Sequence, residues 1–251
     1  MQFPTTFMGW VLFLVEKYGK DFMRGLGVTL ELAILGTIIG SLLGFLVGVI
    51  RSVKVDKHSS PLAQIVIRLL KAVLAIYVEV IRSTPLMVQA MVLYYGTMSI
   101  WGWDIPSFTA GIFALTVHIG AYFSESVRGA IRSIDPGQME GGQAIGMSYT
   151  QIMYHVIVPQ AFRNLIPQIG NTFVSAIKDT SVLNVIAVTE LYFTARTVTG
   201  TYYKFFETYI IICVIYFVCT FTIAHILKLI EKLMAGKSSY ELIEEAEEVT
   251  E

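Results

Sequence analysis

The sequence predicts an all-α polytopic membrane protein with about five transmembrane helices. Composition is the first indication: hydrophobic residues make up 55% of the 251 residues and charged residues only 15%, whereas a soluble domain carries about 25% charged residues. Several long apolar runs are the second indication, because about 20 such residues cross the hydrocarbon core of a bilayer as one helix. Lysine and arginine residues gather at the ends of these runs, which also predicts their orientation.

Residues 1–24 are expected to form an N-terminal interfacial amphipathic segment. The apolar run from Phe7 to Val15 has only about nine residues, too few to span a bilayer. Charged residues follow it as far as Arg24, which favours a helix lying in the membrane interface. A disordered leader is the alternative. Met1 to Thr6 lacks a basic region, so we expect no cleavable signal peptide.

Gly25 to Ile50 is the first predicted span. Its glycines recur at every fourth residue, which places small residues on one helix face and favours close packing against another helix. They are Gly36, Gly40, Gly44 and Gly48. The run is followed by the basic residues Arg51, Lys54 and Lys57. By the positive-inside rule this end is cytoplasmic, and the N-terminus lies outside.

The second and third spans are predicted to leave the cytoplasm and return to it. The second begins at Pro61 with an amphipathic portion and runs to about Met98. Pro85 should kink it by removing a backbone hydrogen bond. A short aromatic turn follows at the outer interface. The third span, Ser107 to about Ile131, ends among arginines on the cytoplasmic side.

The last two spans are expected to be separated by an outer loop. Gln160 to about Thr180 crosses from the cytoplasm, and a second short apolar piece, Val182 to Tyr192, lies at the outer side. A polar, glycine-containing loop is expected over Thr194 to Tyr203. Phe205 to about Leu229 then crosses back, with lysines marking a cytoplasmic C-terminus.

Residues 25–232 therefore form one transmembrane domain, and residues 233–251 form an acidic cytoplasmic tail. The tail holds six glutamates from Tyr240 onward and no basic residue, so we expect it to be partly helical or disordered. The formal net charge of −1 therefore includes this acidic tail, and the rest of the chain has a net positive charge. Its basic residues cluster at the predicted membrane ends, which gives no support to nucleic-acid binding.

The stretch 135–160 is less apolar than its surroundings and predicts two short helices in series. Asp135 is a suitable N-cap for the first, with Pro136 at the first helical position and Gln138 completing a box-like cap. This helix should stop at Gly146, where a left-handed backbone costs least.

The second short helix is expected to begin at Ser148, which caps it with Gln151 three residues later. Gly141 and Gly142 leave part of the first helix without side chains, so another segment can approach it closely. The pattern indicates a short, rigid element outside the bilayer that a partner grips.

Several residues of this stretch share the spacing of a known motif. They are Glu140, Gly141, Gly142, Gly146, Val156, Val158 and Pro159. Their spacing resembles the EAA motif of ABC importer permeases, which reads E-A-A, three residues, G, nine residues and I-x-L-P. This chain departs from the motif by two glycines in place of the alanines and by valines in place of the isoleucine and leucine. An ordinary cytoplasmic loop with helical turns is the alternative.

Three further stretches resemble the polar amino acid permeases of the histidine, glutamine and arginine type. They are Tyr77 to Val88, Ser124 to Ile134 and Ile177 to Leu191, and the resemblance covers roughly Gly25 to Ile230. It implies a transmembrane permease subunit of an ATP-driven ABC importer, which takes up polar amino acids through a bacterial inner membrane.

The resemblance also implies a set of partners. These are a second permease subunit, identical or different, two cytoplasmic ATPase subunits, an extracytoplasmic amino-acid-binding protein and the surrounding lipid bilayer. The chain itself would be no enzyme and would bind no cofactor or metal, while ATP and Mg would lie on the ATPase. The sequence agrees, since it contains no ATP-binding loop, no hydrolase motif and no metal-ligand spacing among its four histidines.

The coupling helix implied by the resemblance is 137–145, with Glu140 as its polar contact to the ATPase. The residues expected to serve coupling are Gly137, Glu140, Gly141, Gly142, Gly146 and Pro159.

Charged residues inside the predicted spans are candidates for the substrate site, because they are costly in a bilayer unless they serve a function. Arg82 is expected to hold the carboxylate of an amino acid, beside Thr84 in a helix weakened by Pro85. Glu125 is expected to hold the ammonium, near Tyr122. Lys178 and Asp179 are further candidates. The alternative for each is a structural pair that holds the bundle together, and for His118 a helix-to-helix hydrogen bond is favoured over a ligand role.

Other functions fit parts of the sequence. An ABC permease for another small zwitterion, such as an opine, would share the motif. An ion-coupled secondary transporter or channel would predict inverted repeats, which are not evident. A membrane scaffold without a transport role would leave the spacing from Glu140 to Pro159 unexplained.

Overall fold

The structure is a computed structural model that describes residues 3–54 and 60–235. Within these ranges all regular secondary structure is helical and no strand forms, which confirms the all-α prediction. The helices are α1 (Phe7–Ser52), α2 (Pro61–Arg82), α3 (Leu86–Trp101), α4 (Ser107–Arg132), α5 (Pro136–Ala144), α6 (Tyr149–Ile152), α7 (Val158–Asp179), α8 (Leu191–Tyr202) and α9 (Phe205–Ala235). A π-helix (Met153–Ile157) joins α6 to α7, and a 3-10 helix (Thr180–Ile186) follows α7. Most of the predicted acidic tail lies outside the described residues.

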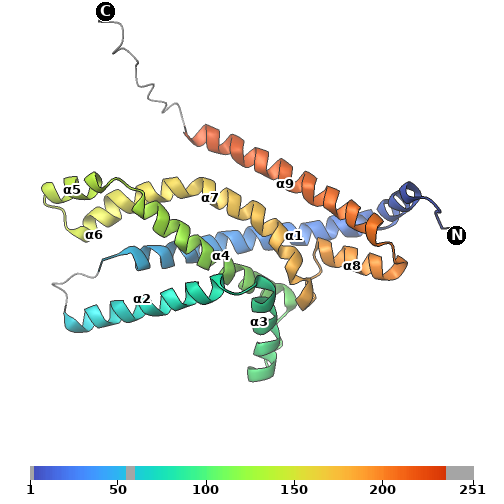
Figure 1. Cartoon of the computed structure of the whole chain (residues 1–251), viewed down its shortest axis with the longest axis horizontal. Helices are drawn as coiled ribbons and strands as arrows, with labels where there is room; N and C mark the ends of the chain where they lie inside the picture. The colour runs from blue at the N-terminus through green and yellow to red at the C-terminus, as the bar shows by residue number, and fades with distance from the viewer. Residues whose placement is uncertain (1–2, 55–59, 236–251) are drawn as a thin grey trace, which may run out of the picture.

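The long helices extend along the long axis of the molecule (Figure 1). α1 runs through much of its length, and α4 and α7 pack against α1. α5 and α6 stand together at one end, while α8 and the N-terminus lie at the other. α3 is turned across the end of α2 instead of continuing its line. The predicted cytoplasmic segment that forms α5 and α6 and the predicted outer segment that forms α8 are thus at opposite ends of the molecule.

The predicted glycine face of α1 is the surface that packs against α4. A Cβ atom placed on Gly44 would lie 2.6 Å from the Gly120 carbonyl oxygen, and one on Gly48 would lie 2.6 Å from Cβ of Val127. Gly36 and Gly40 are similarly close to side chains of α4. Only glycine lets the two backbones approach this closely, so the prediction of a packing face is confirmed.

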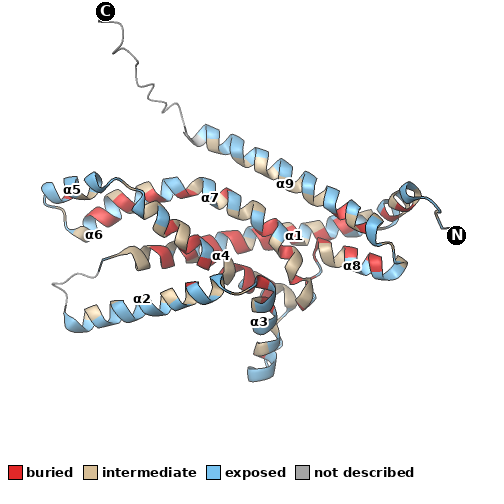
Figure 2. Cartoon of the chain, in the orientation of Figure 1, coloured by how far each residue is buried: buried red, intermediate tan, exposed pale blue. Residues whose placement is uncertain are grey.

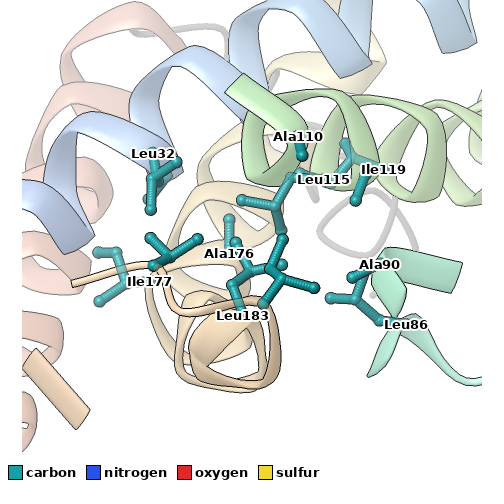
Figure 3. Packing of buried hydrophobic residues seen from close by; sticks show 13 residues of the cluster. Leu32, Leu86, Ala90, Ala110, Leu115, Ile119, Ala176, Ile177 and Leu183 are labelled. Carbon is teal, nitrogen blue, oxygen red and sulfur yellow. The ribbon is translucent and has the colours of Figure 1, made fainter. Parts of the chain in front are cut away.

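The largest buried cluster joins α1, α3, α4, α7 and the 3-10 helix (Figure 3). Leu115 of α4 and Leu183 of the 3-10 helix are both fully buried near its centre. Small residues, such as Ala90 and Ala176, let the helices close around them. This cluster fixes how α3 and the end of α7 sit against the α1–α4 pair.

Apolar side chains are also abundant on the outside of the molecule (Figure 2). α9 and the outer faces of α2 and α3 are mostly exposed, although many of their residues are hydrophobic. An apolar exterior is suited to lipid. Three of the described helices are long and apolar enough to cross a membrane, namely α1, α4 and α9 as far as Leu233. The chain is therefore polytopic, and the count of five spans stays a prediction.

The expected boundary between an interfacial segment and the first span does not appear as a break in the backbone. α1 continues from Phe7 to Ser52 without interruption through Arg24 and Gly25. Phe22 and Leu14 are buried against α8 and α9, so packing as well as lipid holds this part of the helix. The interfacial location of residues 1–24 stays a prediction.

Pro85 was expected to kink one long helix, but it separates two helices. α2 ends at Arg82 and α3 starts at Leu86, with Pro85 as its N-cap. Proline supplies no backbone N–H, and the residue before it avoids helical backbone angles. The Gln89 amide donates to the carbonyl oxygens of Ile81 (2.7 Å) and Thr84 (2.8 Å), so the break is stabilised by a side chain.

The loop expected over 194–203 is wrong, because α8 occupies this region. Glu190 caps its N-terminus by accepting from the backbone N–H groups of Tyr192 and Phe193, and it also accepts from the Tyr216 hydroxyl. Its side chain is fully buried, so these bonds replace the water that the carboxylate has lost. Glu190 was the N-cap signal for this helix in the sequence. The polar, glycine-containing composition of 194–203 favoured a loop instead.

Candidate functional site

The first candidate site is the segment 135–160, which forms an exposed elbow at one end of the molecule (Figure 1). Asp135 caps α5 as predicted: its Oδ1 accepts from the Gly137 N–H at 2.6 Å, and Pro136 stands at the start of the helix. Gln138 does not complete the expected box-like cap. Its side-chain oxygen instead accepts from the Gln160 amide at 3.2 Å, which ties α5 to the start of α7.

α5 ends at Ala144, and Gly146 is the left-handed residue that terminates it, as predicted. Gly146 has φ +81°, the left-handed region in which glycine is favoured. The Met147 N–H donates to the Gly142 carbonyl and the Gly146 N–H to the Gln143 carbonyl, both at 3.0 Å. These two bonds form a Schellman motif, so the end of α5 is satisfied by its own chain.

The second helix begins as predicted but is not short. Ser148 and Gln151 form the reciprocal capping box. From Tyr149 the chain continues through the π-helix into α7 without a break as far as Asp179. α7 begins at Val158 directly after the π-helix, and Pro159 is its second residue, in the first turn, where a missing backbone N–H group costs little. The elbow is thus rigidly continuous with the long helix α7.

The two adjacent glycines of α5 have different surroundings. Gly142 is buried, and a Cβ atom there would lie 2.7 Å from Cγ1 of Ile152. Gly141 is exposed, with no atom within 4 Å of the corresponding position among the described residues. Gly142 therefore serves packing of α5 onto α6, and Gly141 is the glycine that remains open to a partner.

The remaining predicted coupling residues lie on the surface of the elbow. Gly137, Glu140, Gly146 and Pro159 are all exposed. Ile145 adds a large apolar side chain that is 79% exposed. An apolar side chain and a carboxylate on one short, capped helix form a surface suited to a protein partner. The Tyr149 hydroxyl accepts from the Lys54 N–H at 3.0 Å, which fixes the elbow to the end of α1.

The second candidate site is a polar cavity of about 420 Å³ between α4, α7 and the end of α2. Four of the predicted substrate residues line it: Arg82, Tyr122, Glu125 and Asp179. Its volume falls within the range of small-molecule sites, about 300–1,000 Å³. The structure therefore brings together residues that the sequence could only propose one at a time.

Arg82 and Tyr122 contact each other on one side of this cavity. The Arg82 guanidinium carbon lies 5.6 Å from the Tyr122 ring centroid, and the Tyr122 hydroxyl donates to the Arg82 carbonyl oxygen at 3.3 Å. His118 packs against the same ring at 4.9 Å. Its Nδ1 lies 3.1 Å from Oε1 of Gln89, which confirms the expected helix-to-helix hydrogen bond.

Glu125 lines the cavity but is already paired. Its carboxylate lies 2.6 Å from Nη1 of Arg51 and 3.0 Å from Nη1 of Arg128. Arg51 is 12% exposed and Glu125 is 29% exposed, so the group is partly shielded from solvent. This arrangement matches the structural alternative for Glu125, which joins the end of α1 to α4.

Two predicted substrate residues lie away from the polar cavity. Thr84 lines a separate, largely apolar cavity of about 350 Å³, and its hydroxyl donates to the Val80 carbonyl. Lys178 lines a third cavity, beside Tyr209 and Tyr216. Lys178 and Asp179 are neighbours in sequence, so a helix directs them to different sides.

A polar stripe on α7 was not predicted from the sequence. The cavity is also lined by Gln168, Asn171, Thr172 and Ser175. With Asp179 they recur at helical spacing along one face. That periodicity, which places five polar residues on one face of the helix, was the signal that could have identified them.

An all-helical bundle with a lipid-compatible exterior, a polar cavity open to the surface and an exposed elbow is typical of a membrane transport subunit. Residues 66–236 match the family described as the binding-protein-dependent transport system inner membrane component. The match covers more than half of the chain, and the chain belongs to this family. The resemblance to ABC importer permeases is therefore confirmed.

Similar proteins support the same assignment. The chain is 34% identical over 196 residues to a protein named probable amino-acid ABC transporter permease protein PatM of Vibrio harveyi, covering 77% of this chain and 82% of that one. It is 36% identical over 156 residues to the probable glutamine ABC transporter permease protein GlnM of Bacillus subtilis, covering 62% and 72%. A crystal structure of an amino acid ABC transporter with histidines matches with a TM-score of 0.77 at 37% identity, covering 92% of this chain and 99% of that one.

Proposed function

We propose that this chain is the permease subunit through which an ATP-driven importer passes a polar amino acid into a bacterial cell. Membership of the permease family and the amino-acid relatives support this function. The observation that carries it is the pairing of two features in one chain, a capped elbow at the end of the bundle and a polar cavity between α2, α4 and α7. The elbow responds to the ATPase, and the cavity holds the amino acid.

Energy is proposed to enter at α5. The helix is closed at both ends by its own caps, and α6 and Gln160 hold it in place, so a force on it is transmitted to α7 instead of being lost in a flexible loop. Glu140, Gly141 and Ile145 form the exposed part that an ATPase subunit would contact. ATP and Mg would be bound by that ATPase.

Cargo is proposed to bind in the polar cavity. Arg82 supplies a guanidinium for the carboxylate, and Tyr122 orients it. Asp179 is the better candidate for the ammonium, since Glu125 is held by two arginines. Because α7 contributes both the cavity wall and the continuation of the elbow, movement at α5 would change the cavity.

The remaining partners and the orientation follow from this assignment. A second permease subunit, two ATPase subunits and an extracytoplasmic amino-acid-binding protein would complete the importer in the inner membrane. Five spans would place the N-terminus outside and the C-terminus in the cytoplasm, with α5 on the cytoplasmic side.

Charge reversal at the elbow tests the proposal. Glu140→Lys should leave the permease inserted and paired while substrate-stimulated ATP hydrolysis by the assembled importer falls at least about tenfold, because an interface charge is reversed. Thr150→Lys, at an exposed position of α6 outside the proposed contact, is the matched control and should retain stimulation. Full stimulation in Glu140→Lys would refute the coupling role of α5.

A further inference from the structure

The polar cavity contains one cation and one carboxylate that form no ion pair within the part of the chain that the structure describes. No ion pair within 4.0 Å reaches Arg82 or Asp179 there. Lys178, the neighbour of Asp179 in the sequence, acts on this carboxyl group electrostatically but lines a different cavity. The Arg82 guanidinium lies over the Tyr122 ring, which leaves its N–H groups available to an acceptor. Single, unpaired charges of each sign match the carboxylate and ammonium that every free amino acid carries.

The other carboxylate of the cavity, Glu125, is neutralised by two arginines that do not line the cavity. These arginines are Arg51 and Arg128. A cationic side chain on the cargo would have to displace one of these guanidinium groups to gain a partner. The described part of the cavity therefore offers no second free carboxylate for a basic amino acid and no second free cation for an acidic one.

The rest of the polar lining is neutral, and two of its groups have unused hydrogen-bonding capacity. The side-chain amides of Gln168 and Asn171 have no hydrogen-bond partner among the described residues, although both line the cavity. An amide offers two donors and an acceptor. A neutral cargo side chain with both a donor and an acceptor, such as a carboxamide, would satisfy them.

We infer that this cavity selects zwitterionic amino acids with an uncharged, hydrogen-bonding side chain of the carboxamide type over basic and acidic amino acids. The inference rests on the proposed function, since it assigns a cargo class to the same site. Arg82 and Asp179 hold the main-chain groups, and Gln168 and Asn171 are the specificity-determining residues. Selection by the cavity acts in addition to any selection by the binding protein.

The test measures binding to the assembled permease–ATPase complex without the binding protein, so that only the cavity selects. Equilibrium binding of radiolabelled L-glutamine, L-arginine and L-glutamate is compared. Glutamine should bind at least about tenfold more tightly than the other two, because each of these leaves one charge without a partner. Arginine or glutamate binding as tightly as glutamine overturns the inference and leaves the proposed function standing. Failure of all three to bind overturns both.

A charge placed on the specificity face should redirect selection. Asn171→Asp adds a carboxylate beside the cargo side chain, so arginine binding should strengthen at least about tenfold while glutamine binding weakens. Asn171→Ser is the matched control: it removes the amide without adding charge, and it should weaken glutamine binding without improving arginine binding. An unchanged order of affinities in Asn171→Asp would contradict the assignment of this residue.

Discussion

The contrast between Gly141 and Gly142 gives a quantitative test of how the elbow is built. In Gly142→Ala, the new methyl group would lie 2.7 Å from Cγ1 and 2.9 Å from Cδ1 of Ile152. Ordinary carbon–carbon contacts are about 3.5–4.0 Å, so α5 and α6 must separate. Ile152 is fully buried and cannot turn away without disturbing its own cluster. Overpacking of this kind costs about 1–3 kcal/mol.

Hydrogen exchange at the α5 amides measures this cost directly. The expected destabilisation should speed local opening about 5- to 150-fold in Gly142→Ala. Gly141→Ala is the matched control, because the added methyl group has open space around it and alanine is about 0.5–1 kcal/mol better than glycine within a helix. Its exchange should be unchanged or slower.

A double variant separates packing from other causes. In Gly142→Ala combined with Ile152→Ala, the new methyl group occupies space that the isoleucine vacated, so the loss should be smaller than the sum of the two single losses. Strictly additive losses, or equal exchange in the two single glycine variants, would refute the account of this contact.

Three further predictions concern the bundle. Arg51→Ala should lower the free energy of unfolding by about 1–3 kcal/mol, because Arg51 and Glu125 form one partly shielded ion pair. The same change should cost much less in a Glu125→Gln background, and an equal cost in both backgrounds would show that the two side chains are not coupled. Gln89→Leu should cost about 1–3 kcal/mol by leaving carbonyl groups at the α2–α3 break without a donor, and a neutral effect in thermal unfolding would contradict this. A cysteine at the exposed position Thr150 should react with an impermeant reagent only from the cytoplasmic side, and one at the exposed position Thr201 only from outside. Labelling of both cysteines from the same side would exclude the proposed topology.

The elbow could be predicted closely because its signals are local. The caps at Asp135 and Ser148 and the left-handed Gly146 depend on neighbouring residues and elementary backbone geometry. The glycine face of α1 was predicted for a similar reason, since spacing alone defines a helix face. The partner of that face, α4, required the tertiary structure.

The cavity was predicted less well because it depends on contacts between distant parts of the chain. Glu125 looks like a free intramembrane carboxylate until Arg51, 74 positions earlier, is found beside it. Similarly, nothing next to Gln89 in the sequence shows that it caps the preceding helix. Polar content misled the assignment of α8, because the buried bonds of Glu190 that start this helix are tertiary in part.

ATP-dependent uptake tests the central claim most directly. The complete importer is reconstituted in proteoliposomes, with the binding protein outside and ATP inside, and accumulation of radiolabelled L-glutamine is followed. The account predicts uptake against a gradient that requires ATP and is lost in Glu140→Lys. Uptake that proceeds without ATP and follows an imposed sodium or proton gradient would contradict it.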